Sequence, residues 1–139
     1  TRYWNGKSPI PVIIDPNNRI CVNSKVIEKH KKIFHYIDKS IKVSSKESIQ
    51  INFKKSVQEI LINLHQNKIN SVLVEGGQKT IQKFINGNFW DEIRYFVGNK
   101  KIYGGIKAPK IKSKNNYWIK KDISNDILYR LVNYSTNKL

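Results

Sequence analysis

The segment of residues 71–80 constrains the fold of this chain most strongly, because an apolar run leads through an acidic residue and two glycines into a helix-compatible stretch. Such a run is short and apolar enough to form a central parallel strand. A strand that turns into a helix through Gly76 and Gly77 places the Glu75 carboxylate beside the N–H groups of the helix start. This arrangement suits a polar substrate next to a phosphate-bearing cofactor, although the two glycines alone are equally typical of a tight turn.

Strand-like segments recur along the rest of the chain. The first of them ends in Asp15 and is followed by a turn that begins at Pro16. The last two are expected to pair as a hairpin at the edge of a sheet. The predicted strands are residues 10–15, 33–37, 49–53, 71–74, 91–97, 117–120 and 127–134.

Two helices are predicted between these strands. Ser56 and Glu59 have the spacing of a capping box, with Ser56 as the N-cap. A second helix follows the two glycines and ends near Asn86 and Gly87. The order strand, helix, strand, helix, strand predicts an α/β layered fold with crossover connections. The apolar positions at helical spacing are Val57, Ile60, Leu61 and Leu64 in the first helix and Ile81, Phe84 and Ile85 in the second.

The chain is strongly basic, with a formal net charge of +16 from 26 Lys and Arg residues against 10 Asp and Glu residues. Such a charge is compatible with a nucleic-acid partner, and residues 100–121 interleave lysines with Tyr103, Tyr117 and Trp118, on which bases could stack. The basic residues are mostly lysine, however, and accompany abundant asparagine and isoleucine, as in proteins from A/T-biased genomes. We therefore expect no nucleic-acid partner, but a positive field that attracts phosphorylated ligands.

Several kinds of chemistry find no support in the sequence. His30, His35 and His65 have no metal-ligand spacing, and we expect each of them at the surface or at a sheet edge. A nucleophile elbow, a Rossmann fingerprint and a Walker loop are all missing. Phosphate binding would therefore have to use the turn at Gly76 and Gly77.

Composition also bounds where such a chain works. Cys21 is the only cysteine, which excludes an internal disulfide and favours a reducing, cytoplasmic compartment. No apolar run approaches the roughly 20 residues that a membrane-spanning helix needs, so no membrane partner is expected.

Several short segments together resemble a known family. In chain order they are residues 1–2, 6–15, 74–77, 84–85, 90–92 and 104–109. Their order and spacing are similar to those in the reductase domain of the bacterial bifunctional riboflavin-biosynthesis deaminase/reductase. The resemblance implies a three-layer α/β fold like that of dihydrofolate reductase, with a mixed sheet, helices on both faces and an incomplete N-terminal part.

The resemblance implies an NADP-dependent oxidoreductase. The family uses NADPH to reduce the ribosyl group of 5-amino-6-(5-phosphoribosylamino)uracil to the ribityl product. A hydride would pass from the nicotinamide to the first carbon of the sugar in its open, imine-like form, so that the cofactor carries the difficult step. No catalytic side chain follows from the resemblance.

The resemblance also implies binding roles for individual residues. Arg2 corresponds to a substrate-binding arginine, whose guanidinium suits the substrate phosphate. Glu75 corresponds to a substrate-binding glutamate. Pro16 stands where the family often has a serine that contacts the cofactor, and proline offers neither an N–H nor a hydroxyl. The run that would hold the NADP phosphates is Gly77, Gln78, Lys79, Thr80, Ile81, Gln82 and Lys83, with the first four as the direct contacts.

Under the resemblance, residues 1–139 form the C-terminal portion of one reductase domain. The first strands of that domain and the zinc-dependent deaminase domain would then lie outside the chain, so we expect no metal site here. We also expect a homo-oligomer for the full-length protein and little or no turnover by these residues alone. The alternatives are a small basic nucleic-acid-binding module, a dihydrofolate-reductase-like enzyme acting on another heterocycle, and a degenerate chain retained for assembly.

Overall fold

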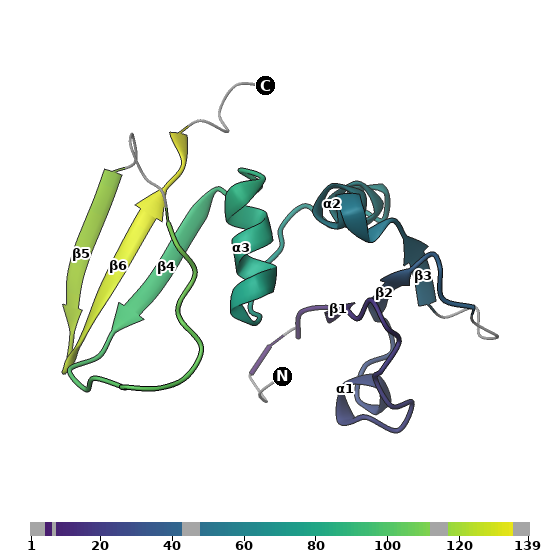
Figure 1. The fold of residues 1–139 in the computed structure, drawn as a ribbon, viewed down its shortest axis with the longest axis horizontal. Helices are drawn as coiled ribbons and strands as arrows, with labels where there is room; N and C mark the ends of the chain where they lie inside the picture. Colours follow the sequence, from purple (N-terminus) through teal and green to yellow (C-terminus); the bar gives the residue numbers. More distant parts are fainter. Residues whose placement is uncertain (1–4, 7, 43–47, 112–116, 135–139) are drawn as a thin grey trace. The chain divides into compact units, whose positions relative to one another are not determined.

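The computed structural model describes residues 5–6, 8–42, 48–111 and 117–134 (Figure 1). The chain divides into two compact units, Thr1–Ser71 and Val72–Leu139. Each unit has its own sheet and is described by itself. Parallel strands in the first unit and antiparallel strands in the second confirm the α/β class with mixed strand directions.

The first unit contains a parallel sheet with the strand order β1-β2-β3. Its strands are β1 (Val12–Ile14), β2 (Phe34–Asp38) and β3 (Ser48–Ile51), which confirm the three strands predicted for this half of the sequence. A short helix that the sequence did not predict, α1 (Lys25–Glu28), lies between β1 and β2. After β3 the chain forms a 3-10 turn (Phe53–Lys55) and then α2 (Ser56–Gln66).

The core of the first unit lies between one face of this sheet and α2. Phe34 and Tyr36 alternate along β2 toward that face, and α2 supplies Ile60 and Leu64, all of them at most 4% exposed. The opposite face of β2 is also buried, since Ile37 is fully buried. A strand covered on both faces reads as a continuous apolar run, which is the pattern from which β2 was predicted.

The start of α2 differs from the predicted capping box. Ser56 is already helical, with φ −55° and ψ −42°, so it is not the N-cap. The N-cap of α2 is Lys55, whose side chain makes no capping hydrogen bond. Asn52 instead caps the preceding 3-10 turn, and its side chain accepts the Lys54 N–H at 3.1 Å. The Glu59 carboxylate reaches back to the Asn52 N–H at 2.9 Å. Glu59 thus binds a backbone N–H as in a capping box, but the 3-10 turn places that N–H four residues before the predicted N-cap, and the bond is not reciprocated.

Tyr36 provides a pH-dependent test of this core. Its hydroxyl donates to Asn63 Oδ1 at 2.8 Å, and burial raises its pKa to about 12. Because this value exceeds the roughly 10 of an unfolded tyrosine, its contribution to stability is complete below about pH 10 and is lost as the pH rises toward 12. We expect the free energy of unfolding to fall more between about pH 9 and pH 11 in the parent protein than in Tyr36→Phe. Denaturant titration measures this difference.

A matched control separates Tyr36 from the general effect of alkali on the lysines. Tyr103 is 95% exposed, and Tyr103→Phe should keep the pH dependence of the parent. An equal pH dependence in the parent and Tyr36→Phe would contradict the prediction.

The second unit contains helix α3 (Gln78–Asn86) and an antiparallel sheet with the strand order β4-β6-β5 (Figure 1). Its strands are β4 (Glu92–Val97), β5 (Tyr117–Ile123) and β6 (Asp126–Val132). The β5–β6 hairpin and its place at the sheet edge were both predicted. Gly87 ends α3 as expected, and a side chain there would collide with the Phe89 ring, whose nearest atom would lie 2.6 Å from an added Cβ.

Aromatic side chains join the three strands on one face of this sheet. The rings of Tyr95 and Tyr129 stack with centroids 5.0 Å apart, and Trp118 meets Tyr95 edge to face at 5.8 Å. On the opposite face Glu92 accepts hydrogen bonds from Arg94 and from Arg130 Nε, the latter at 2.8 Å. The bond from Arg130, followed by that from Arg94, lowers the pKa of the Glu92 carboxyl group.

The strand predicted at residues 71–74 does not form in this structure. Residues 71–77 have no assigned secondary structure, and no described strand pairs with them. A strand requires a neighbour for its backbone groups, and this segment begins where the two units divide. Leu73 is accordingly 82% exposed, although the sequence pattern placed it in a sheet core.

Candidate functional site

The predicted site residues belong to both units. Pro16 lies in the first unit, whereas Glu75 and residues 77–83 lie in the second. Arg2 lies outside the described residues. The start of α3 and the turn after β1 are therefore described separately, each within its own unit.

The start of α3 has the geometry of an anion site. Gly77 is the N-cap, with φ −66° and ψ 161°, and it supplies no capping side chain. Its carbonyl accepts the N–H groups of Thr80 at 3.0 Å and Ile81 at 3.3 Å. The first N–H groups of a helix have no partner within the helix and carry the positive end of its dipole. Those of Gln78 and Lys79 therefore suit a phosphate.

The two glycines before α3 have different surroundings. A Cβ added to Gly76 would lie 3.3 Å from the Thr80 Cβ, so Gly76 permits the helix start to pack on the preceding segment. A Cβ added to Gly77 would meet nothing within 4 Å. The fold of this chain therefore imposes no steric need for glycine at position 77, and the open space above it is available to a ligand.

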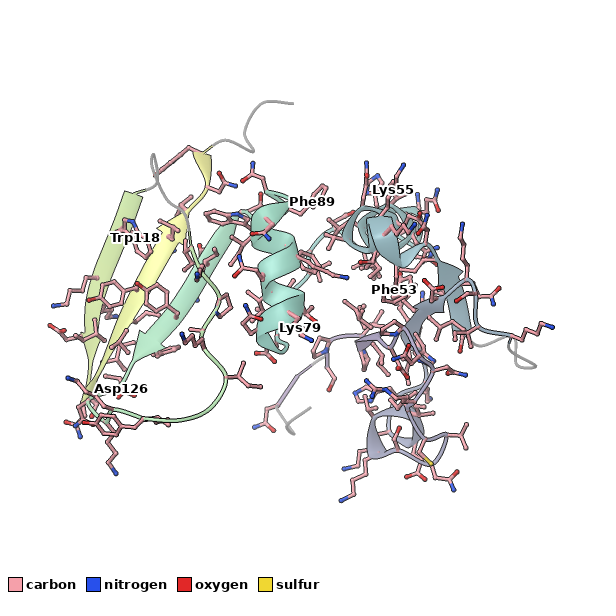
Figure 2. The ribbon with its side chains drawn as sticks, viewed as in Figure 1. Phe53, Lys55, Lys79, Phe89, Trp118 and Asp126 are labelled. Atoms are coloured by element: carbon pink, nitrogen blue, oxygen red, sulfur yellow. The ribbon has the colours of Figure 1, made fainter. Side chains whose placement is uncertain are left out.

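The side chains along α3 divide by exposure. Lys79, labelled in Figure 2, is exposed. Lys83, one turn further along α3, is also exposed, and both bring positive charge to the helix. Gln78, Thr80 and Ile81 are half-buried. A cationic face beside free helical N–H groups strengthens the attraction for a phosphate group.

Gln82, a member of the predicted phosphate run, makes hydrogen bonds to a distant segment of the second unit. Its Oε1 accepts the Lys110 N–H at 2.7 Å, and its Nε2 donates to the Lys110 carbonyl at 3.1 Å. The same Nε2 donates to Asn86 Oδ1 at 2.9 Å. Gln82 thus binds the backbone of the segment after β4 to α3, and sequence spacing gave no signal for this contact across 28 positions.

Glu75 is exposed and lies two residues before Gly77, the N-cap of α3. This places a carboxylate close in sequence to the helix start, as predicted, but on an unpaired backbone rather than at the end of a strand.

The turn after β1 holds the other predicted contact, Pro16. The Asp15 carboxylate accepts the Ile20 N–H at 2.8 Å, and the Asp15 carbonyl accepts the Asn18 N–H at 3.0 Å. Asn18 adopts a left-handed conformation with φ 51°, which asparagine tolerates better than most residues. Pro16 is half-buried, and its carbonyl accepts the Asp38 N–H at 3.2 Å. Asp15 thus holds this turn through two of its N–H groups, with its carboxylate on Ile20 and its carbonyl on Asn18.

His35 lies in a buried position, which corrects the surface or edge position expected from the sequence. It is 9% exposed on β2, with Nδ1 3.0 Å from Ser48 Oγ and Nε2 3.5 Å from Asp15 Oδ2. The available signal was its place within an apolar strand of the parallel sheet, where even polar positions are covered.

Metal ligands do not gather in the described part of the chain. Residues 5–6, 8–42, 48–111 and 117–134 contain no group of three or more His, Cys, Asp or Glu side chains able to hold a metal ion. Within these same ranges, no helix is long and apolar enough to cross a membrane.

Comparison with known proteins identifies relatives of this chain. The family model described as the RibD C-terminal domain matches residues 1–117. A curated riboflavin biosynthesis protein RibD from Aquifex aeolicus (strain VF5) is 27% identical over 107 residues, which are 72% of this chain and 30% of the relative.

Solved structures share the fold. RibD from Acinetobacter baumannii, form 2, aligns with a TM-score of 0.65 at 18% identity. The alignment covers 94% of this chain and 41% of the Acinetobacter baumannii chain. A diaminohydroxyphosphoribosylaminopyrimidine deaminase/5-amino-6-(5-phosphoribosylamino)uracil reductase from Thermotoga maritima aligns with a TM-score of 0.65 at 20% identity, covering 94% of this chain and 39% of its own. The chain thus spans less than half the length of each of these relatives.

Proposed function

Since this chain belongs to the RibD C-terminal domain family, we propose that it forms part of an NADPH-dependent reductase of riboflavin biosynthesis. The reaction is the reduction of the ribosyl group of 5-amino-6-(5-phosphoribosylamino)uracil to a ribityl chain. The observation that carries the proposal is the open helix start at Gly77, within the 117 residues matched by the family model.

The residues of α3 fit the phosphates of NADPH. Gly77 leaves room for the pyrophosphate to approach the backbone, and the N–H groups of Gln78 and Lys79 would donate to its oxygens. The Lys79 ammonium group would neutralise part of the charge. Gln82 contributes indirectly, because it fixes the segment around Lys110 beside the helix.

Glu75 and Arg2 are the residues that would hold the substrate. Glu75 would accept hydrogen bonds from the pyrimidine or the sugar, and the Arg2 guanidinium would bind the substrate phosphate in a bidentate manner. NADPH, when bound, supplies the hydride. The protein side chains supply position and exclude water, which lowers the entropic part of the barrier.

We further propose that these residues make only part of the pocket. The chain spans 30% of the curated relative and 41% of the first solved structure. The 139 residues are therefore expected to bind NADPH weakly and to turn over slowly or not at all.

The direct test uses NADPH in which both hydrogens on the nicotinamide carbon that gives up the hydride are replaced by deuterium. The 139-residue chain, and the same residues within a longer protein of the family, are each incubated with 5-amino-6-(5-phosphoribosylamino)uracil. We expect deuterium at the first carbon of the ribityl product from the longer protein, and little product from the chain alone. Product without deuterium would exclude direct hydride transfer, and rapid turnover by the chain alone would contradict the incomplete pocket.

A further inference from the structure

Three polar side chains lie side by side on one face of the sheet of the first unit. His35 on β2 lies between the other two, with Nδ1 3.0 Å from Ser48 Oγ and Nε2 3.5 Å from Asp15 Oδ2. The strand register explains the arrangement, because His35 pairs with Ser48 on β3 and with Ile13 on β1, two residues before Asp15. All of these contacts lie within the first unit.

The Nε2 atom of His35 is buried and has no hydrogen-bond partner in the structure. Buried polar atoms in native proteins are nearly always bonded, so this atom is an exception. Its neighbour is Asp15 Oδ2, but 3.5 Å is longer than an ordinary hydrogen bond. Oδ2 itself is engaged elsewhere, since it accepts the Ile20 N–H at 2.8 Å.

The hydrogen-bonding capacity of a neutral imidazole explains this geometry. A neutral ring carries one N–H, and its other nitrogen is an acceptor. If Nδ1 carries the hydrogen and donates to Ser48 Oγ, Nε2 is an acceptor that faces the carboxylate of Asp15, which is also an acceptor. Two acceptors form no hydrogen bond, which accounts for both the separation and the missing bond of Nε2.

Asp15 is the charged group beside the imidazole. Strands β1 and β3 carry no ionisable side chain, and α2 packs on the other face of β2, so its charged side chains lie across the sheet from His35. In the segment between β1 and β2, the half-buried His30 has its Nδ1 2.9 Å from the Val26 carbonyl oxygen. The other titratable residues of that segment are all exposed, namely Arg19, Cys21, Lys25, Glu28, Lys29, Lys31 and Lys32.

We propose that His35 is a proton-dependent latch within the first unit. When the imidazole takes up a proton from solvent, Nε2 becomes a donor and binds Asp15 Oδ2, while Nδ1–H keeps its bond to Ser48. A charge-assisted bond of this kind is about 2.8 Å long, so Nε2 and Oδ2 approach each other by roughly 0.7 Å. Oδ2 uses a second lone pair for this bond and keeps the Ile20 N–H.

The latch acts on the turn of residues 15–20. Asp15 holds that turn through its carboxylate on the Ile20 N–H and its carbonyl on the Asn18 N–H. A bond from the imidazolium fixes the orientation of the carboxylate, so proton uptake makes the turn more rigid and proton loss loosens it. Histidine is the side chain whose charge ordinarily changes between about pH 5 and pH 8. The inference concerns the first unit alone and is independent of the proposed function.

The position of the imidazole hydrogen is measured by nitrogen-15 spectra of the histidine rings in the parent protein. We expect the Nδ1–H tautomer at about pH 8 and an imidazolium at about pH 5. An Nε2–H tautomer of the neutral ring would overturn the inference, because Nε2 would then be a donor without any proton uptake. A ring of His35 that stays neutral at pH 5 would overturn it as well.

Hydrogen exchange at the Ile20 amide measures the response of the turn. We expect its protection factor, which is corrected for the intrinsic exchange rate at each pH, to rise roughly fivefold from about pH 8 to about pH 5. Asp15→Asn keeps an oxygen for the Ile20 amide but removes the charge, so the rise should be absent. His65→Gln, at an exposed position of α2, is the matched control and should show the rise of the parent. An equal rise in the parent and Asp15→Asn would overturn the inference.

Ser48→Ala tests the third member of the group. Without the hydroxyl group, Nδ1–H has no acceptor, so the neutral ring should change to the Nε2–H tautomer and donate to Asp15. The Ile20 amide should then be as protected at about pH 8 as at about pH 5, within roughly twofold. A Ser48→Ala variant that keeps the Nδ1–H tautomer would show that Ser48 does not set the hydrogen position, and the latch would be wrong.

Discussion

Replacing Gly77 with alanine is expected to weaken NADPH binding by at least about tenfold, or roughly 1.4 kcal/mol. The added methyl group would occupy the open space through which a pyrophosphate approaches the backbone at the start of α3. Folding should change little, because the Cβ would meet nothing within 4 Å and the φ of −66° suits alanine. Alanine is a poorer N-cap than glycine, which lowers stability, but it also reduces the entropy of the unfolded chain, which raises stability. The two effects oppose each other, so we expect the free energy of unfolding to change by less than about 1 kcal/mol.

Gly104→Ala provides the matched control for this prediction. A Cβ at Gly104 would also meet nothing within 4 Å, but this glycine lies outside the predicted site. NADPH titration should give the parent affinity for Gly104→Ala and a reduced affinity for Gly77→Ala, with equal melting temperatures. Unchanged affinity in Gly77→Ala would show that no ligand approaches the backbone there.

Replacing Leu64 with alanine is expected to lower the free energy of unfolding of the first unit by about 2–5 kcal/mol. Leu64 is 1% exposed and belongs to the core cluster between α2 and the parallel sheet. Truncation removes buried methyl groups and leaves a cavity that Phe34, Tyr36 and Ile60 can only partly fill. Hydrogen exchange of the β2 amides under increasing denaturant measures the change within this unit.

Ile62, on the same helix, tests whether burial is the cause. It is 51% exposed, and Ile62→Ala should cost no more than about 0.5 kcal/mol. Similar losses for the two variants would mean that α2 does not pack as described.

Much of the fold could be predicted because local patterns and tertiary structure agree. The apolar run around Tyr36 and the helical stripe of Ile60 and Leu64 form the core of the first unit, as their periodicity indicated. The β5–β6 hairpin forms from the last two predicted strands, at residues 117–120 and 127–134, which are neighbours in the sequence. In each case the residues that set the pattern are also those that become buried.

The failures arise where tertiary partners decide the outcome. Residues 71–74 have the composition of a strand, yet a strand exists only when another backbone pairs with it. The side chain of Asn52 caps the 3-10 turn that precedes α2, so Ser56 is not an N-cap, and a spacing rule does not detect such a turn. His35 was misplaced because the covering of both faces of β2 depends on segments distant in sequence.

The candidate site shows the same division. The helix start after Gly77 was readable from local sequence, since glycine and a following helix suffice to expose N–H groups. The contact of Gln82 with Lys110 and that of Asp15 with His35 join positions 28 and 20 residues apart. Such pairs have no local signature, so a single sequence does not reveal them.

The bond between Gln82 and Lys110 also bears on how the sequence of this region can change over generations. Both hydrogen bonds end on the main chain of Lys110, so every residue type at that position keeps the carbonyl acceptor and only proline removes the N–H donor. Substitutions at position 110 therefore leave these two hydrogen bonds nearly unaffected, whereas substitutions of Gln82 remove them. Codon bias can therefore change the surface charge of the segment around Lys110 without changing its attachment to α3.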